Sequence, residues 1–227
     1  MRVDKCWAHT KACQKGDDMS DSTFLHTEYQ MCFEQLRYYD TRQEEILKYL
    51  ITLTSAVATA QFAVFKIFET PTTGFFSAQS FLSIVVFVGS ILLYLMMLQN
   101  RLYFVFVARQ INAIRKYMLK TEAVEFMENQ MPTSISFSAF KRSSVHTLQL
   151  IGAAFISSLF AGASVFGLFH VLQFPYVYTA FVLVFLGVGT SEAIGGALYL
   201  KNESAKSADE AIHGQSEKDS ASRAGTD

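Results

Sequence analysis

Residues 148–172 read LQLIGAAFISSLFAGASVFGLFHVL, and residues 176–200 read YVYTAFVLVFLGVGTSEAIGGALYL. Both stretches are apolar on every face of a helix and are long enough to cross a hydrocarbon core of ~30 Å. Residues 49–68 and 81–98 have the same character, and the three prolines of the chain all fall between these four stretches. Because proline breaks helices, this division predicts an all-α membrane protein with four transmembrane helices.

Positive charge is distributed unevenly over the segments that connect the four stretches. Residues 69–80 and 173–176 contain no Lys or Arg, whereas residues 99–147 contain seven. Cytoplasmic segments of membrane proteins retain Lys and Arg, so residues 99–147 and both termini are predicted to be cytoplasmic. A first transmembrane hairpin with its cytoplasmic part then covers residues 19–147, and a second hairpin covers residues 148–200.

The two ends of the chain differ in composition from the rest. Residues 201–227 are rich in Ser, Ala and Gly with mixed charge, which predicts a disordered cytoplasmic tail. Residues 1–18 are polar and lack the apolar core of a signal peptide. Codons for residues 15–17 can form a purine-rich ribosome-binding sequence before Met19, so Met19 is expected to be the native start of a protein of the bacterial cytoplasmic (inner) membrane. An ordinary disordered N-terminal tail is the alternative.

A seam of mainly apolar residues precedes the first transmembrane stretch. Residues 22–50 contain no Gly or Pro, and the seam residues recur at alternating spacings of four and three, with Gln43 as one polar interruption. This heptad pattern predicts that the first transmembrane helix continues into the cytoplasm. A second seam follows the second transmembrane stretch. The two seams consist of Leu25, Tyr29, Cys32, Leu36, Tyr39, Gln43, Ile46 and Leu50, and of Phe104, Val107, Ile111, Ile114 and Met118.

The two seams are expected to meet antiparallel and to form a cytoplasmic helical stalk. Leu36 and Tyr39 on one seam, with Ile111 and Ile114 on the other, are the predicted residues of the stalk interface. Packing of the seams between subunits of an oligomer is one alternative. In another, the second seam lies flat on the membrane surface.

Glu192 is the one clearly ionisable residue well inside a transmembrane stretch, where an acid is costly unless it is paired, protonated or hydrated. Hydroxyl groups at its depth on the other three helices suggest a polar layer or pore lining. These residues are Thr52, Ser55, Thr59, Ser90, Tyr94, Ser157 and Ser158. The alternative is a protonated Glu192 that only forms a hydrogen bond between helices.

Small residues recur along the third and fourth transmembrane stretches, a pattern that lets helix backbones approach closely. Gly162, Gly195 and Gly196 are therefore predicted to lie at helix–helix contacts. The third and fourth helices are expected to form a tightly packed pair, within one chain or across an oligomer axis.

The chain lacks the motifs of common enzyme classes. It contains no phosphate-binding glycine loop, no HExxH motif and no nucleophile elbow. Cys6, Cys13 and Cys32 lack zinc-site spacing, and the net charge of −1 gives no basic surface for nucleic acid. We therefore expect no enzymatic activity, no cofactor, no metal site and no direct binding of nucleic acid.

The general plan, a compact helical membrane bundle with a coiled cytoplasmic stalk, is similar to that of small membrane effectors in bacterial anti-phage systems. This resemblance is one of architecture. It implies a homo-oligomeric, pore-forming or membrane-perturbing effector or sensor for antiviral defence, triggered by a cytoplasmic protein partner at the stalk. The alternatives are a membrane scaffold that anchors a cytoplasmic partner, and a small ion channel or carrier.

Overall fold

The computed structural model describes residues 21–68, 70–121, 139–141 and 144–209. Four helices account for nearly all of this part of the chain, and it contains no strand. The helices are α2 (Asp21–Ile67), α3 (Thr73–Thr121), α4 (Val145–Val171) and α5 (Val177–Asp209). All four are long and apolar enough to cross a membrane, as expected of a membrane protein. The predicted all-α class with four long apolar helices is confirmed.

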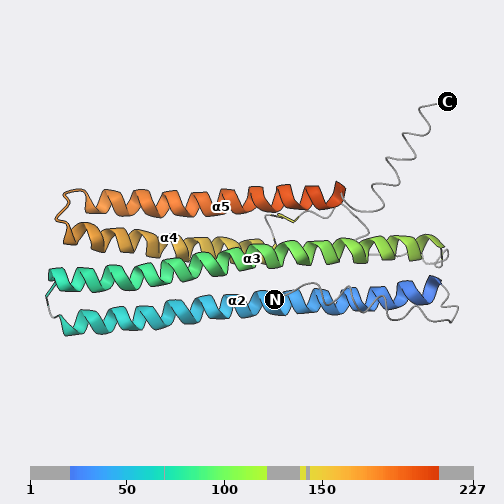
Figure 1. Cartoon of the computed structure of the whole chain (residues 1–227), viewed down its shortest axis with the longest axis horizontal. Helices are drawn as coiled ribbons and strands as arrows, with labels where there is room; N and C mark the ends of the chain where they lie inside the picture. The colour runs from blue at the N-terminus through green and yellow to red at the C-terminus, as the bar shows by residue number, and fades with distance from the viewer. Residues whose placement is uncertain (1–20, 69, 122–138, 142–143, 210–227) are drawn as a thin grey trace, which may run out of the picture.

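The helices lie in a row in chain order, each packed against the next (Figure 1). Helix α5 also contacts α3, and α2 touches α4, but α2 and α5 do not contact each other in the described part of the chain. Within the most apolar window of each helix, 56% of the residues are buried in α4 and 33% in α3, against 6% in α2 and in α5. The row is therefore open, with α3 and α4 inside it and α2 and α5 at its two edges.

Helices α2 and α3 are much longer than a bilayer requires. They contain 47 and 49 residues, which is about 70 Å each at 1.5 Å per residue. Helix α2 contains no Gly or Pro to interrupt it, and the chain turns back to α3 just after Pro71. The α2–α3 pair extends beyond α4 and α5 at one end (Figure 1).

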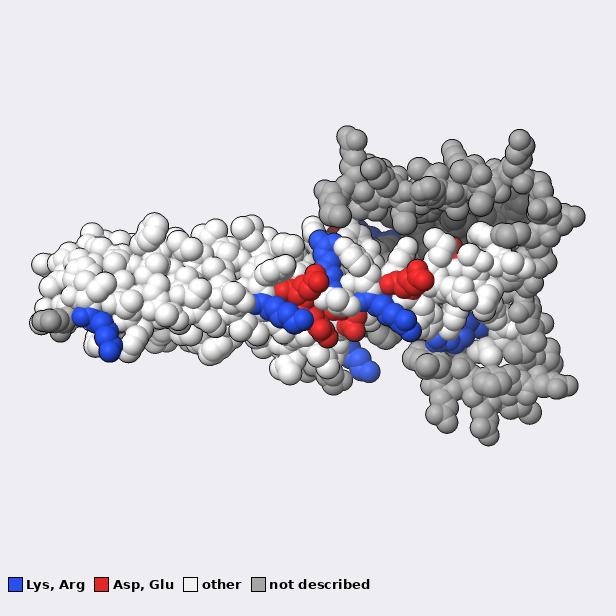
Figure 2. Space-filling view, turned by 90° about the horizontal axis from the view of Figure 1, so that it is seen from below, with Lys and Arg blue, Asp and Glu red and all other residues white. Residues whose placement is uncertain are grey.

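Most charged residues on the described part of the chain lie in one half of this elongated molecule. Figure 2 shows one face on which acidic and basic side chains gather over that half, while the other half is almost free of them. Lys66 and Glu192 are the only Lys, Arg, Asp or Glu within the four predicted transmembrane stretches. The division fits a membrane-facing half and a water-facing half.

The buried core lies where all four helices are side by side. Its larger cluster includes Leu50 of α2, Met97 of α3, Ala153 of α4 and Leu200 of α5, each at most 1% exposed. Large apolar side chains on the outer faces of α2 and α5 remain exposed, as in Phe65 at 64%. Exposed apolar surface on this scale fits contact with lipid or with other subunits.

The C-terminal boundary differs from the one predicted. Helix α5 continues to Asp209, so the disordered tail expected from residue 201 is helical over its first part. A hydrogen bond helps to hold this extension, because Nη1 of Arg109 donates to the backbone oxygen of Ser204 at 2.6 Å. The predicted leader, residues 1–18, and residues 210–227 lie outside the described part of the chain.

Candidate functional site

Two helices bring hydroxyl groups to Glu192 on α5. The hydroxyl of Ser157 on α4 donates to Oε1 of Glu192 on α5 at 2.7 Å. The hydroxyl of Tyr94 on α3 donates to the backbone oxygen of Glu192 at 2.6 Å. Oε2 of Glu192 is buried and has no hydrogen-bond partner among the described residues. One carboxylate oxygen is therefore held in place while the other remains available.

A groove runs between α3 and α5 beside this carboxyl group. It has a volume of about 610 Å³, and its lining is mainly apolar, with Leu95 and Leu98 from α3. Ser191, Gly195 and Gly196 border it on α5. Because α3 and α5 touch only locally, their side chains do not close this space.

Three residues of the predicted polar layer do not reach Glu192. Thr52, Ser55 and Thr59 are exposed on α2, which does not contact α5. The two threonine hydroxyls form hydrogen bonds within α2. Thr52 donates to the Lys48 backbone oxygen at 2.8 Å, and Thr59 donates to the Ser55 backbone oxygen at 2.9 Å. Within one chain these residues are therefore separate from Glu192, because position along a sequence does not give the side of the helix on which a residue lies.

The hydroxyls predicted on the other helices divide between two roles. Tyr94 and Ser157 contact Glu192 as described above. Ser158 is buried, and it donates to the Phe155 oxygen at 2.9 Å within its own helix. Ser90 does the same with the Phe87 oxygen at 2.9 Å. Ser158 and Ser90 therefore support helix packing and are not part of the Glu192 site.

The glycines predicted at helix contacts also divide. A Cβ atom added at Gly162 would lie 3.0 Å from the Phe181 ring, and one added at Gly196 would overlap the Tyr94 hydroxyl. A Cβ atom at Gly195 would meet nothing within 4 Å. Gly162 and Gly196 therefore allow close approach of helices, whereas Gly195 is exposed on α5 and makes no such contact within the chain.

The adjacent glycines offer a matched pair of substitutions. Gly196→Ala should reduce the free energy of unfolding by about 1–3 kcal/mol, because the added methyl displaces a Tyr94 hydroxyl that is fixed by its hydrogen bond. Gly195→Ala should leave stability unchanged or slightly higher, because alanine favours helix and the space is open. Thermal unfolding in detergent, followed by circular dichroism, measures both. Equal effects of the two substitutions would contradict the α3–α5 contact.

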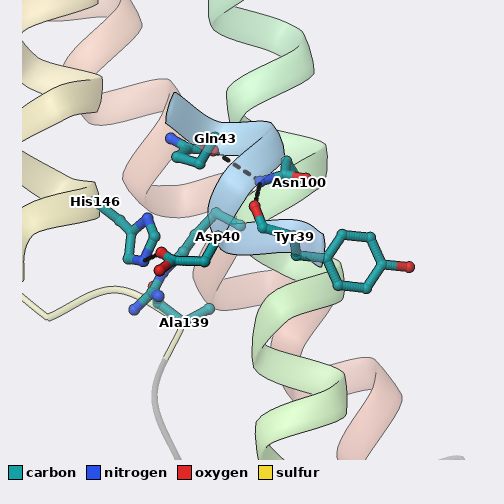
Figure 3. Close-up of polar contacts among 7 residues, drawn as sticks. Tyr39, Asp40, Gln43, Asn100, Ala139 and His146 are labelled. Atoms are coloured by element: carbon teal, nitrogen blue, oxygen red, sulfur yellow. Dashed lines mark hydrogen bonds and ion pairs between the residues drawn. The ribbon is translucent and has the colours of Figure 1, made fainter. Parts of the chain in front are cut away.

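A second polar cluster lies outside the predicted transmembrane stretches, where α2, α3 and α4 meet (Figure 3). Nδ2 of Asn100 donates to the backbone oxygen of Tyr39 at 2.7 Å and to Oε1 of Gln43 at 3.0 Å. Gln43 is fully buried and Asn100 is 4% exposed. Because this amide network occupies Oε1 of Gln43, only its Nε2 donor remains free.

Arg101 and His146 complete this cluster beside the amides. Nε of Arg101, which is 3% exposed, donates to the backbone oxygen of Ala139 at 3.1 Å. Burial lowers the pKa of Arg101 to about 10, so Arg101 stays charged at pH 7. Nε2 of His146 lies 3.5 Å from Oδ1 of Asp40. Both Arg101 and His146 lie outside the predicted transmembrane stretches.

The surroundings of His146 favour its neutral form. Burial lowers its pKa, the charge of Arg101 lowers it further, and Asp40 opposes both. In the tautomer with its proton on Nε2, that proton faces Asp40, whose Oδ1 lies 3.5 Å away, and Nδ1 is an acceptor. That Nδ1 is buried without a partner among the described residues.

The sequence prediction missed this cluster as a candidate site. Gln43 was visible as the polar interruption of the first seam, and Asn100 and Arg101 directly follow the second transmembrane stretch. Their meeting with His146 depends on how α4 packs across α2 and α3. The polar interruption was the one usable signal.

The residues predicted for the stalk interface lie along the α2–α3 contact. Ile111 and Ile114 are 3% and 4% exposed, and Leu36 is partly buried. The ring of Tyr39 stacks on that of Tyr103 with centroids 5.8 Å apart. Farther along, Nη2 of Arg115 donates to the Tyr29 hydroxyl at 3.1 Å, so α2 and α3 also contact each other there.

The described residues contain no group of three or more His, Cys, Asp or Glu side chains that could hold a metal ion. Comparison of the chain with known protein families, with curated proteins and with solved structures found no match.

Proposed function

We propose that this chain is a non-enzymatic, oligomeric protein of the bacterial cytoplasmic membrane that opens a path for ions or perturbs the bilayer. Both termini and the far end of the α2–α3 pair would lie in the cytoplasm. A cytoplasmic protein partner would bind this end, which would act as a stalk, and trigger the transmembrane part. The setting would be that of an antiviral effector, as its architecture suggests.

The observation that carries the proposal is the incomplete site around Glu192. An acid within a transmembrane stretch is costly unless it is paired or hydrated, and one oxygen of this acid has no partner among the described residues. The acid borders an open groove of about 610 Å³. A second subunit, or water in a path between subunits, would complete the site.

The exposed face of α5 supports assembly. Gly187, Ser191 and Gly195 follow one another at four-residue steps, and all three are exposed. Small residues at this spacing let a neighbouring helix approach closely in a membrane. The same face borders the groove, so a second copy seated there would place its helix beside Glu192.

The length of α3 supports coupling between the proposed stalk and the groove. One uninterrupted helix carries Tyr94, which donates to the Glu192 backbone oxygen, and Ile111, which is buried. A partner that separates or rotates the α2–α3 pair would therefore move a wall of the groove directly.

Glu192→Gln tests the proposal. The amide keeps the shape and the hydrogen bond from Ser157 but removes the charge, so cation flux through protein-containing liposomes should fall at least tenfold while thermal stability changes little. Glu45→Gln, at an exposed position outside the transmembrane stretches, is the matched control.

Native mass spectrometry in detergent measures the assembly in parallel. A monomer without flux would overturn the proposal and favour a membrane scaffold that only anchors a partner. Unchanged flux in Glu192→Gln would show that ions take a path that this acid does not line.

The proposed orientation has its own test. Cysteines introduced at Thr73 and Gln173 should react with a membrane-impermeant maleimide from outside intact cells, and a cysteine at Ser134 should react only after lysis. The reason is the absence of Lys and Arg from the two short turns and the seven such residues in the central segment. Labelling of Ser134→Cys in intact cells would reverse the orientation.

A further inference from the structure

A polar cavity lies between α2 and α4, separate from the Glu192 groove. Its volume is about 390 Å³. Asp40, Gln43 and Glu44 line it from α2, and His146 and Gln149 line it from α4. Because α2 and α4 touch only at a few positions, the cavity is the space left between them over α3. It lies next to the predicted transmembrane stretch 148–172, which includes Gln149.

Three residues that line this cavity carry buried polar atoms without partners among the described residues. Gln43 is fully buried, and its Nε2 is a donor with no partner among the described residues. Asn100 fixes the orientation of that amide by donating to its Oε1 at 3.0 Å. Nδ1 of His146 and Oε1 of Gln149 are buried acceptors that also lack partners in the described part of the chain. Unpartnered buried groups are uncommon in folded proteins, which points to an occupant.

The charges around the cavity indicate the sign of that occupant. Asp40 and Glu44 contribute carboxylates, and no Lys or Arg is among the described residues that line it, although the charged Arg101 acts on His146 from α3. The two unpartnered acceptors suit N–H groups, and the Gln43 donor suits an oxygen. A primary ammonium group close to an oxygen atom has this combination of charge, donors and acceptor.

We propose that this cavity binds a primary ammonium group that carries a neighbouring oxygen. The ammonium would donate to Nδ1 of His146 and Oε1 of Gln149, with the carboxylates of Asp40 and Glu44 balancing its charge. Nε2 of Gln43 would donate to the oxygen. The source is either the ethanolamine headgroup of a membrane lipid, since the cavity lies beside the transmembrane stretches, or a small free amino alcohol.

Ethanolamine and choline distinguish hydrogen bonding from charge alone, because both carry one positive charge and a hydroxyl but only ethanolamine has ammonium N–H donors. Each is titrated into the full-length protein, labelled with ¹⁵N in glutamine side chains, in phosphatidylcholine nanodiscs. The Gln43 side-chain amide resonance, identified by its loss in Gln43→Met, reports binding. This resonance should shift saturably as ethanolamine is added. The concentration of choline needed for the same shift should be at least tenfold higher.

Two variants connect binding to the cavity. Gln149→Met removes an acceptor but keeps the Gln43 signal, and it should weaken ethanolamine binding about tenfold. Gln110→Met, at an exposed glutamine of α3 outside the cavity, should leave binding unchanged. Unfolding temperatures of both variants within a few degrees of the parent show that the fold is kept.

A second arm identifies the source of the ammonium. If the Gln43 resonance shifts in phosphatidylethanolamine nanodiscs without added amine, and Gln149→Met abolishes the shift, the ligand is the lipid headgroup. A shift with free ethanolamine alone assigns the site to a soluble amine. Equal binding of choline, or no shift in either arm, overturns the proposal and leaves a cavity filled by water.

Discussion

Ile111→Asp is expected to reduce the free energy of unfolding by about 3–5 kcal/mol, because it places an unpaired carboxylate in the α2–α3 contact. Ile111 is 3% exposed, and Ile114, its neighbour on the same face of α3, is 4% exposed. The substitution lies outside the transmembrane stretches, so the protein should still insert into the membrane. Hydrogen–deuterium exchange of the α2–α3 pair measures the loss as faster exchange on both helices.

Gln110→Asp is the control for this prediction. It introduces the same charge one residue earlier, at an exposed position, and should change stability by no more than about 0.5 kcal/mol. If both variants exchange like the parent protein, the buried contact between the two seams does not exist in solution.

Asn100→Leu is expected to cost about 2–3 kcal/mol, although leucine is more apolar than asparagine. The substitution removes the donor to Gln43 Oε1 and leaves a fully buried amide with no hydrogen bond to a described residue. The bond to the Tyr39 oxygen, 2.7 Å long, is lost as well. Urea unfolding in detergent measures the change.

A double substitution separates the hydrogen bond from the change in shape. Asn100→Leu combined with Gln43→Leu should recover stability to within about 1 kcal/mol of the parent, because replacing both partners removes the unsatisfied groups. It also removes two atoms that lack partners among the described residues, Gln43 Nε2 and Asn100 Oδ1. Strictly additive losses in the double variant would mean that the two amides do not interact.

The sequence predicted the four long apolar helices, because each apolar stretch is long and apolar enough to cross a membrane. It predicted less well which residues share a face. Thr52, Ser55 and Thr59 are exposed on α2, which does not contact α5, while Tyr94 and Ser157 contact Glu192. A helix that is apolar all round carries no pattern that marks its inner side, so this face is decided only when the helices pack.

The same limit appears where α3 leaves the apolar half. Asn112 is polar and does not belong to the second seam, yet it is 6% exposed. Arg109, also outside the seam, donates to the backbone oxygen of Ser204 at 2.6 Å on α5. The seam pattern indicates one contact face, but α3 packs against α2, α4 and α5 and is covered on more than one side. The spacing of apolar residues along one seam of a helix cannot predict contacts with a second neighbouring helix.

The open row of helices determines which symmetries an assembly can have. With α2 at one edge and α5 at the other, and no contact between them in the described part of the chain, the subunit has two unlike edges. Joining unlike edges gives a heterologous interface that repeats around a ring, and the number of subunits follows from the angle between neighbours. Joining α5 to α5 gives an isologous interface with a twofold axis, which stops at a dimer and leaves both α2 helices facing lipid. In a ring, one face of every subunit would therefore line the space around the central axis. In a dimer, only the two Glu192 grooves would be enclosed, at the interface between the subunits.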